Sequence, residues 1–164
     1  MLIKVKNKDT LIFDDFIFRC AVGKKGISNS KREGDLRTPK GLFKLGAVYY
    51  RSDRIKNIQT KLALKKIKKN MGWCNDVRFP KKYNKLIKVE KKIKYEKLKR
   101  HDHKYDLLIP IKYNFRKPTT GLGSCIFIHL TKDYKPTTGC VALKEKDFLI
   151  MLKLIKRNSK IKIL

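Results

Sequence analysis

Short alternations of hydrophobic and polar residues recur along most of the chain, and this period of two predicts many short β-strands. The run Tyr105–Tyr113, YDLLIPIKY, has the composition of a buried strand but contains Pro110. Because proline lacks the N–H that a central strand donates, this run is expected at a sheet edge or next to a bulge. Strands are predicted at residues 2–5, 16–22, 43–45, 105–113, 124–130, 141–143 and 161–164.

Helical spacing of apolar residues is found in one segment near the C-terminus, Glu145–Arg157. Apolar residues recur more loosely at Gln59–Lys69, where a second, short helix is expected. The stretch Gly72–Asn84, GWCNDVRFPKKYN, has the composition of a loop. The apolar face of the C-terminal helix contains Phe148, Leu149, Leu152 and Ile155.

These elements indicate a mainly β fold with one or two helices, built as a β-sandwich or an open barrel. With 164 residues and 41% hydrophobic content, the chain can bury a substantial core. No internal repeat or linker divides the sequence, so we expect a single domain over residues 1–164.

The sequence offers no segment that would span a membrane, because no apolar run reaches the roughly 20 residues required. The opening residues, MLIKVKNKDTLIF, do not form a secretory signal, since Lys4, Lys6, Lys8 and Asp9 interrupt any apolar segment. The compartment is therefore left open between the cytoplasm and export by a route that these residues do not encode.

The charge balance is strongly basic, with 43 Lys and Arg against 14 Asp and Glu and a net charge of +29. Such a surface attracts polyanions, including nucleic acid, anionic lipid and anionic cell-wall polymers. The lysines are, however, scattered through the chain, as a general bias toward lysine would place them. No RNA- or DNA-binding signature accompanies them, so an obligate nucleic-acid partner is not expected.

The cysteines and histidines do not show the spacing of a metal site. The four cysteines form no CxxC pair, and a nucleophilic role for one would leave three that cannot all form disulfides. His101 and His103 flank Asp102, but no third ligand is evident. We therefore expect neither a metal nor another cofactor, and a weak preference for reduced thiols.

One cysteine stands in a setting that suits catalysis. Cys140 follows Gly139 and precedes an apolar strand, and His129 lies 11 residues upstream at the end of another strand. A thiol becomes a strong nucleophile when an imidazole accepts its proton. A glycine before it permits a sharp turn that directs backbone N–H groups at a developing oxyanion. The same two residues are also compatible with a buried cysteine and a structural histidine.

Several segments resemble one protein family in the same order along the chain. Residues 126–143, IFIHLTKDYKPTTGCVAL, are similar to the signature of the YkuD-type L,D-transpeptidases, in which a histidine leads through a loop to Ser/Thr-His-Gly-Cys. KREGDLRTPKGLF resembles the family segment Gly-Asp-x-x-Thr-Pro-x-Gly-x-Phe. GWCNDVRFPKKYN, RHDHKYD, YN and GLGSCIFIH resemble a bacterial branch. The resemblance spans about residues 18–155 and implies a YkuD-like β-sandwich or open barrel.

The resemblance implies that Cys140 is the nucleophile and His129 the general base, with Gly139, Thr138 and Thr137 in the loop at the oxyanion hole. The family often has a second histidine where this chain has Thr138, and its histidine-to-cysteine spacing is commonly longer. The branch that this chain resembles accepts another residue there. Residues expected to line or support the substrate cleft are Arg100, Asp102, His103, Tyr105, Asp106, Tyr113 and Asn114.

The implied reaction is acyl transfer on peptidoglycan stem peptides, without a cofactor. A tetrapeptide stem would form a thioester on Cys140, and an amine of a second stem would then receive the acyl group, in a periplasmic location. Water as the acceptor would give an L,D-carboxypeptidase or amidase. The more distant alternative is a basic nucleic-acid-binding protein with an inactive site. The oligomeric state is not indicated.

Overall fold

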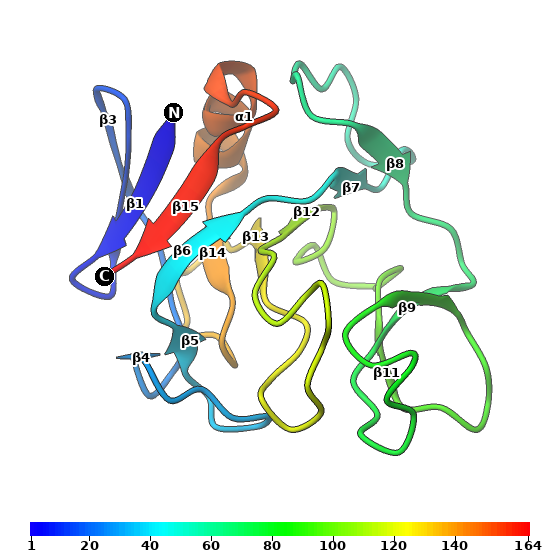
Figure 1. The fold of residues 1–164 in the computed structure, drawn as a ribbon. Coiled ribbons are helices and arrows are strands. Elements are labelled where there is room, and N and C mark those ends of the chain that lie inside the picture. The colour runs from blue at the N-terminus through cyan, green and yellow to red at the C-terminus, as the bar shows by residue number, and fades with distance from the viewer.

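The computed structural model describes all residues, 1–164, and contains fifteen strands and one helix (Figure 1). This mainly β architecture confirms the predicted fold class. The elements are β1 (Leu2–Lys6), β2 (Thr10–Phe13), β3 (Phe16–Arg19), β4 (Ile27–Ser28), β5 (Thr38–Pro39), β6 (Gly41–Lys44), β7 (Val48–Tyr50), β8 (Leu64–Lys66), β9 (Met71–Cys74), β10 (Leu86–Lys88), β11 (Tyr95–Lys97), β12 (Leu107–Pro110), β13 (Phe127–Leu130), β14 (Val141–Leu143), α1 (Glu145–Leu154) and β15 (Lys160–Ile163).

A five-stranded sheet in the order β3-β2-β1-β15-β6 contains both ends of the chain (Figure 1). β1 pairs antiparallel with β2 and in parallel with β15, so the first and last strands lie side by side. Ile3, Val5, Ile161 and Ile163 are buried, whereas the residues between them are exposed. One face of this sheet therefore packs on the core, and the other faces solvent.

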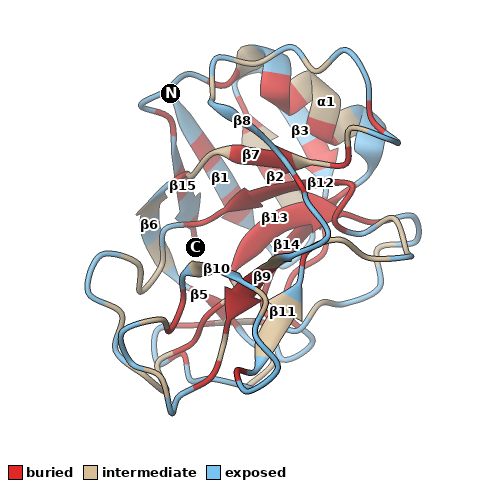
Figure 2. Cartoon of the chain, turned by 90° about the vertical axis from the view of Figure 1, so that its right-hand side faces the viewer, coloured by how far each residue is buried: buried red, intermediate tan, exposed pale blue.

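A second five-stranded sheet, in the order β14-β13-β12-β7-β8, lies in the interior, and β12, β13 and β14 are buried at every position (Figure 2). The main core of 24 buried residues combines side chains from both sheets and from α1. The helix contributes Phe148, Met151 and Leu152, each fully buried. Burial of a side chain of this size stabilises the fold by about 1.5–3 kcal/mol.

A small sheet in the order β10-β9-β11 lies beside a second, aromatic core. Its central strand, β9, falls within Gly72–Asn84, so the prediction of a loop there is wrong at its start. Trp73 is buried against Phe127, with ring centroids 5.3 Å apart, and donates Nε1–H to Asn84 at 3.0 Å. Sequence alternation gave no signal for β9 because three of its four residues are buried.

The helix predicted at Gln59–Lys69 is wrong, because this segment is extended and contains β8, which pairs in parallel with β7. Ile67 is buried, but Leu64 is 44% exposed, so the apolar residues do not share a helical face. The backbone N–H of Ile67 donates to Tyr50 at 2.8 Å. Strand pairing with a distant segment has overridden a loose local pattern.

Pro110 lies at a bulge and not at a sheet edge. β12 is a central strand, flanked by β13 and β7, so the edge alternative is wrong. Leu108 pairs with the facing segment, and Ile111 forms a bridge to it, with two residues between them. The facing segment has three residues over the same stretch. This additional residue is a β-bulge and confirms the prediction. The carbonyl of Pro110 accepts the N–H of Gly46 at 2.8 Å.

The remaining strand predictions are confirmed in position, with ends that differ by up to three residues. The sequence did not predict six further short strands, which are β2, β4, β5, β7, β10 and β11. The C-terminal helix is confirmed but ends at Leu154, three residues earlier than predicted. With ten residues, this helix is too short and too polar to cross a bilayer, and no other helix is present.

Candidate active site

Two adjacent parallel strands hold the two residues with candidate chemistry. β13 ends at Leu130, the chain crosses over through residues 131–140, and β14 then runs parallel to β13. Within this pairing His129 lies opposite Ala142. Cys140 precedes β14 by one residue and therefore lies on the same face as Ala142. The strand pairing thus brings Cys140 beside the strand that carries His129.

His129 is held as a neutral imidazole with one nitrogen free. Its Nδ1 lies 2.9 Å from the carbonyl oxygen of Leu130, and since a carbonyl only accepts, Nδ1 carries the proton. The ring is 7% exposed and meets the edge of Tyr105, with centroids 5.5 Å apart. Burial lowers the pKa of His129 to about 4, although the bond to Leu130 opposes this. Nε2 is therefore available as a proton acceptor.

Cys140 is held as a neutral thiol at the base of the same crossover. It is 5% exposed, and its Sγ donates to the carbonyl of Cys125 at 3.2 Å and accepts the N–H of Phe127 at 3.4 Å. Burial raises the pKa of Cys140 to about 12, while the Phe127 N–H and the charge of Lys31 act in the opposite direction. The resting thiol is thus bonded to the backbone, and the imidazole is not its partner.

A cavity of about 490 Å³ opens onto both groups. His129, Cys140 and Ala142 line it together with the crossover residues and with residues from 96–105. Of the Lys, Arg, Asp and Glu residues that line it, four are cations and two are acids, so the cavity attracts anions. These residues are Arg100, Lys104, Lys132, Lys135, Glu96 and Asp133.

The loop before Cys140 is fixed by the hydroxyl of Thr137, which donates to the carbonyl of Cys140 at 2.7 Å and accepts the N–H of Gly139 at 3.1 Å. The backbone N–H groups of Thr138 and Cys140 have no hydrogen-bond partner. Gly139 has φ +144°, and a Cβ on it would lie 2.9 Å from the carbonyl oxygen of Arg37. Only glycine fits this position, and the loop before Cys140 keeps two unpaired N–H donors.

A buried lysine supports this loop from residues 31–37, and the sequence analysis did not identify it as a site residue. Lys31 is 5% exposed, and its ammonium lies 2.6 Å from Asp35. The Cε of Lys31 lies 3.6 Å from the position that a Cβ on Gly139 would occupy. Asp35 also accepts the N–H of Arg37, whose carbonyl packs against Gly139. The segment KREGD, part of the family resemblance, was the signal that pointed to this support.

Arg100 links the predicted cleft residues to the imidazole. It pairs with Asp102 at 2.7 Å and with Glu96 at 3.1 Å, and its guanidinium lies 5.0 Å from the ring centroid of Tyr105. The hydroxyl of Tyr105 donates to Glu96 at 3.0 Å, and its ring contacts His129. Arg100 and Tyr105 line the cavity, whereas Asp102 holds Arg100 from outside it. Glu96 was missed because it lies in a lysine-rich stretch with no motif.

Three other predicted cleft residues are not among those that line the cavity. The hydroxyl of Tyr113 donates to the carbonyl of Leu122 at 2.6 Å, and the amide of Asn114 donates to carbonyls in the same loop at 2.9 Å. Asp106 pairs with Arg54 at 3.0 Å. Tyr113 and Asn114 therefore support the loop that leads to β13 and do not face the thiol.

The remaining histidines and cysteines do not assemble into a cluster. His103 lines the cavity, and its Nε2 is buried without a hydrogen-bond partner, whereas His101 is exposed. No group of three His, Cys, Asp or Glu side chains is arranged to hold a metal ion. All four cysteines are free thiols.

Burial of a neutral imidazole makes the stability of the fold depend on pH. The pKa of His129 is about 4 in the folded protein and about 6.5 in an unfolded chain, so below pH 6.5 the unfolded state binds the additional proton. Stability is thus complete above pH 6.5 and falls as the pH approaches 4. We expect the free energy of unfolding to decrease by about 3 kcal/mol over this window, measured by urea denaturation.

The matched comparison uses His129→Gln, which cannot titrate, and His101→Gln, which changes an exposed histidine. His129→Gln is expected to lose most of the decrease in the free energy of unfolding between pH 6.5 and 4. His101→Gln is expected to retain this decrease. An unchanged slope in His129→Gln would show that other groups cause the acid sensitivity.

Comparison with known protein families gives a match over essentially the whole chain. The family model described as YkuD, L,D-transpeptidase catalytic domain, matches residues 2–163. Among solved structures, that of Bdellovibrio bacteriovorus Bd1075 is similar, with 18% sequence identity and a TM-score of 0.48 over 99% of this chain. The chain spans 47% of the length of that protein. No curated protein matches the sequence.

The family match and the local geometry concern the same residues. The matched range contains both parallel strands, the crossover between them and every residue that lines the cavity. Because the match covers essentially the whole sequence, the chain belongs to the YkuD family of L,D-transpeptidase catalytic domains.

Proposed function

We propose that this protein is a cysteine acyltransferase that forms L,D cross-links between peptidoglycan stem peptides through a thioester on Cys140. The observation that carries the proposal is the opening of one cavity onto both Cys140 and His129, which adjacent parallel strands hold. Membership of the YkuD family supports peptidoglycan as the substrate.

The resting charges support general-base activation instead of a preformed ion pair. At neutral pH the pKa of Cys140, about 12, and that of His129, about 4, leave both groups uncharged. The thiol proton must therefore pass to Nε2 of His129 as the sulfur attacks the substrate carbonyl. Substrate binding has to draw Sγ away from the carbonyl of Cys125, its resting hydrogen-bond acceptor.

The loop supports a role in stabilising the tetrahedral intermediate. The free N–H groups of Thr138 and Cys140 are the donors proposed for the oxyanion hole, and Thr137 holds the loop around them. A donor of this kind contributes about 3 kcal/mol to transition-state stabilisation. The N–H of Gly139 bonds to Thr137 at rest, so it is not one of the two free donors.

In the first half-reaction, the carbonyl of the diamino-acid residue of a tetrapeptide stem is attacked. The C–N bond to the terminal D-alanine breaks, its nitrogen takes the proton from the His129 imidazolium, and a thioester remains on Cys140. In the second half-reaction, an amine of another stem attacks the thioester while His129 accepts its proton. The thiolate then leaves and takes this proton from the His129 imidazolium, which restores the neutral thiol and imidazole.

The cationic cavity supports an anionic acyl donor. Lys104 and Lys132 line the cavity and take part in no ion pair, whereas Arg100 is paired with Glu96 and Asp102. The terminal carboxylate of a stem peptide would find two unpaired cations there. This arrangement agrees with a substrate that has a free carboxylate next to the scissile amide.

The test is incubation of the protein with a tetrapeptide stem, with and without a second stem as amine acceptor, followed by mass spectrometry. We expect release of D-alanine and a cross-linked product that requires the acceptor. Tripeptide without cross-linking would assign an L,D-carboxypeptidase instead. Release of D-alanine by neither route would refute the proposal.

A further inference from the structure

The solvent-facing side of the β3-β2-β1-β15-β6 sheet, here called the basic face, is rich in lysine and has no carboxylate at its strand positions. Asp9, Asp14 and Asp15 lie only in the turns at its ends. None of its lysines takes part in an ion pair. These exposed lysines are Lys4, Lys6, Lys44, Lys160 and Lys162.

The strand pairing places like charges opposite one another on the basic face. Lys4 of β1 is the partner of Lys162 of β15, and Lys160 is the partner of Lys44 of β6. Like charges that face each other across a sheet repel and destabilise it. An anionic partner would relieve this repulsion, and nothing within the chain does so.

Exposed apolar side chains gather at the same sheet. Eight large apolar residues of the protein are exposed, and six of them belong to its strands or to the chain ends beside them. Ile17 is 73% exposed and Leu42 is 54% exposed. Leu42 is the partner of Lys162. Ile17 is the partner of Ile12, which pairs with Lys4 on its other side, so both exposed side chains share the solvent-facing side with the lysines. The six are Met1, Leu2, Phe16, Ile17, Leu42 and Leu164.

We propose that the basic face docks on the surface of an anionic lipid bilayer. A sheet face with lysines at its centre and exposed apolar side chains on its edge strands matches the membrane interface, where phosphates meet the cations and the apolar groups enter the acyl boundary. Nucleic acid would satisfy the lysines but leave Ile17 and Leu42 in water. A second copy of the chain would oppose lysine with lysine.

The basic face and the active site are built from different parts of the chain. All cavity-lining residues lie between positions 96 and 142, whereas the sheet uses residues 2–19, 41–44 and 160–163 (Figure 1). The inference therefore does not depend on the proposed acyl transfer. Membrane docking would bring the enzyme to a surface without altering the residues around Cys140.

The experiment measures binding to vesicles of phosphatidylcholine with 30% phosphatidylglycerol and to vesicles of phosphatidylcholine alone, by flotation at physiological salt. The protein is expected to bind only the anionic vesicles. Two double variants test the two components: Lys4→Gln with Lys162→Gln, and Ile17→Ser with Leu42→Ser. Each is expected to weaken binding roughly tenfold or more without lowering the thermal unfolding midpoint.

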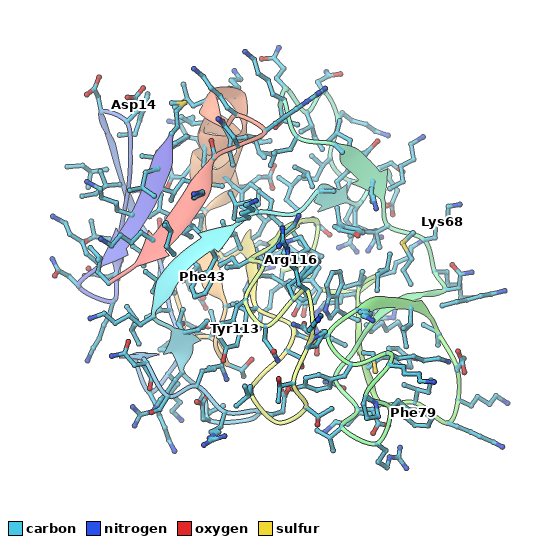
Figure 3. All side chains as sticks on the ribbon, in the orientation of Figure 1. Asp14, Phe43, Lys68, Phe79, Tyr113 and Arg116 are labelled. Atoms are coloured by element: carbon cyan, nitrogen blue, oxygen red, sulfur yellow. The ribbon has the colours of Figure 1, made fainter.

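The matched controls change exposed residues of the same types elsewhere, as Lys68→Gln with Lys69→Gln and as Leu64→Ser with Val77→Ser. Lys68 lies on the side of the molecule away from the sheet (Figure 3). Both controls are expected to bind like the unchanged protein, because they leave the basic face intact.

Four results would overturn the proposal. The first is the absence of binding to anionic vesicles, and the second is an equal loss of binding in the control variants, which would indicate net charge alone. The third is normal vesicle binding by Ile17→Ser with Leu42→Ser, together with equally strong binding to single-stranded DNA, which would assign a general polyanion surface. Loss of self-association in that variant, measured by sedimentation, would assign a second copy.

Discussion

Replacement of the thiol in Cys140→Ala is expected to abolish acyl-enzyme formation. A β-lactam of the carbapenem class resembles an acyl donor, and opening of its ring by the thiolate would add its whole mass to the protein. The unchanged protein should gain one such mass, and the variant none, in intact-protein mass spectrometry. Turnover of tetrapeptide stems should fall below detection at the same time, because none of the other three cysteines lines the cavity.

Cys20→Ala is the matched control for this variant. Cys20 is also buried, at 2% exposure, and burial raises its pKa to about 12 as well. It lies outside the cavity, so Cys20→Ala should form the adduct normally. An adduct on Cys140→Ala would place the nucleophile elsewhere. Because the Phe127 N–H loses its acceptor in Cys140→Ala, a stability loss of about 1–3 kcal/mol must be checked separately by denaturation.

Removal of the proton acceptor in His129→Gln is expected to have the second largest effect. General-base catalysis contributes typically 10²–10⁴-fold, so kcat for the tetrapeptide should fall by about that factor while KM changes little. The rate of acylation in the unchanged protein should decline on the acid side as the pH approaches the pKa of His129, about 4. The variant should lose this acid limb.

His101→Gln, which changes an exposed histidine outside the cavity, serves as the control and should retain both the rate and the acid limb. Retention of full kcat by His129→Gln would remove the imidazole from the mechanism and leave only its packing against Tyr105. A parallel fall in thermal stability would instead indicate a role in the fold, so the unfolding midpoint is recorded for each variant.

The alternation of side chains was the most informative feature of the sequence for the fold. Alternation located the first and last strands, short apolar runs located the strands beside the candidate site, and helical spacing located the single helix. Alternation gave no signal for β9, where three of four residues are buried, and the local pattern was misleading for β8, where pairing with a distant segment decided the conformation. Alternation of hydrophobic and polar residues shows which side chains of a strand share a face, but it does not identify the strands that pair with it.

The candidate site was predictable in its chemistry but not in its surroundings. Cys140, His129 and Gly139 followed from a local motif, because residues that act together in one crossover are close in sequence. Lys31 lies 109 positions before Cys140, and Glu96 lies 33 positions before His129. No local pattern in the sequence shows that residues so far apart contact one site. Tyr113 and Asn114 lie in a motif yet support a loop outside the cavity.

The sequence by itself determined the family and the mainly β architecture, and it supplied Cys140 and His129 as the candidate thiol and imidazole. Only the tertiary structure decided that both groups are neutral at rest, that one cavity joins them, and that lysines share one exposed sheet face with apolar side chains. The physical reason is that protonation depends on desolvation and surface composition depends on strand order. Both are set by residues that are distant in the chain and adjacent only after folding.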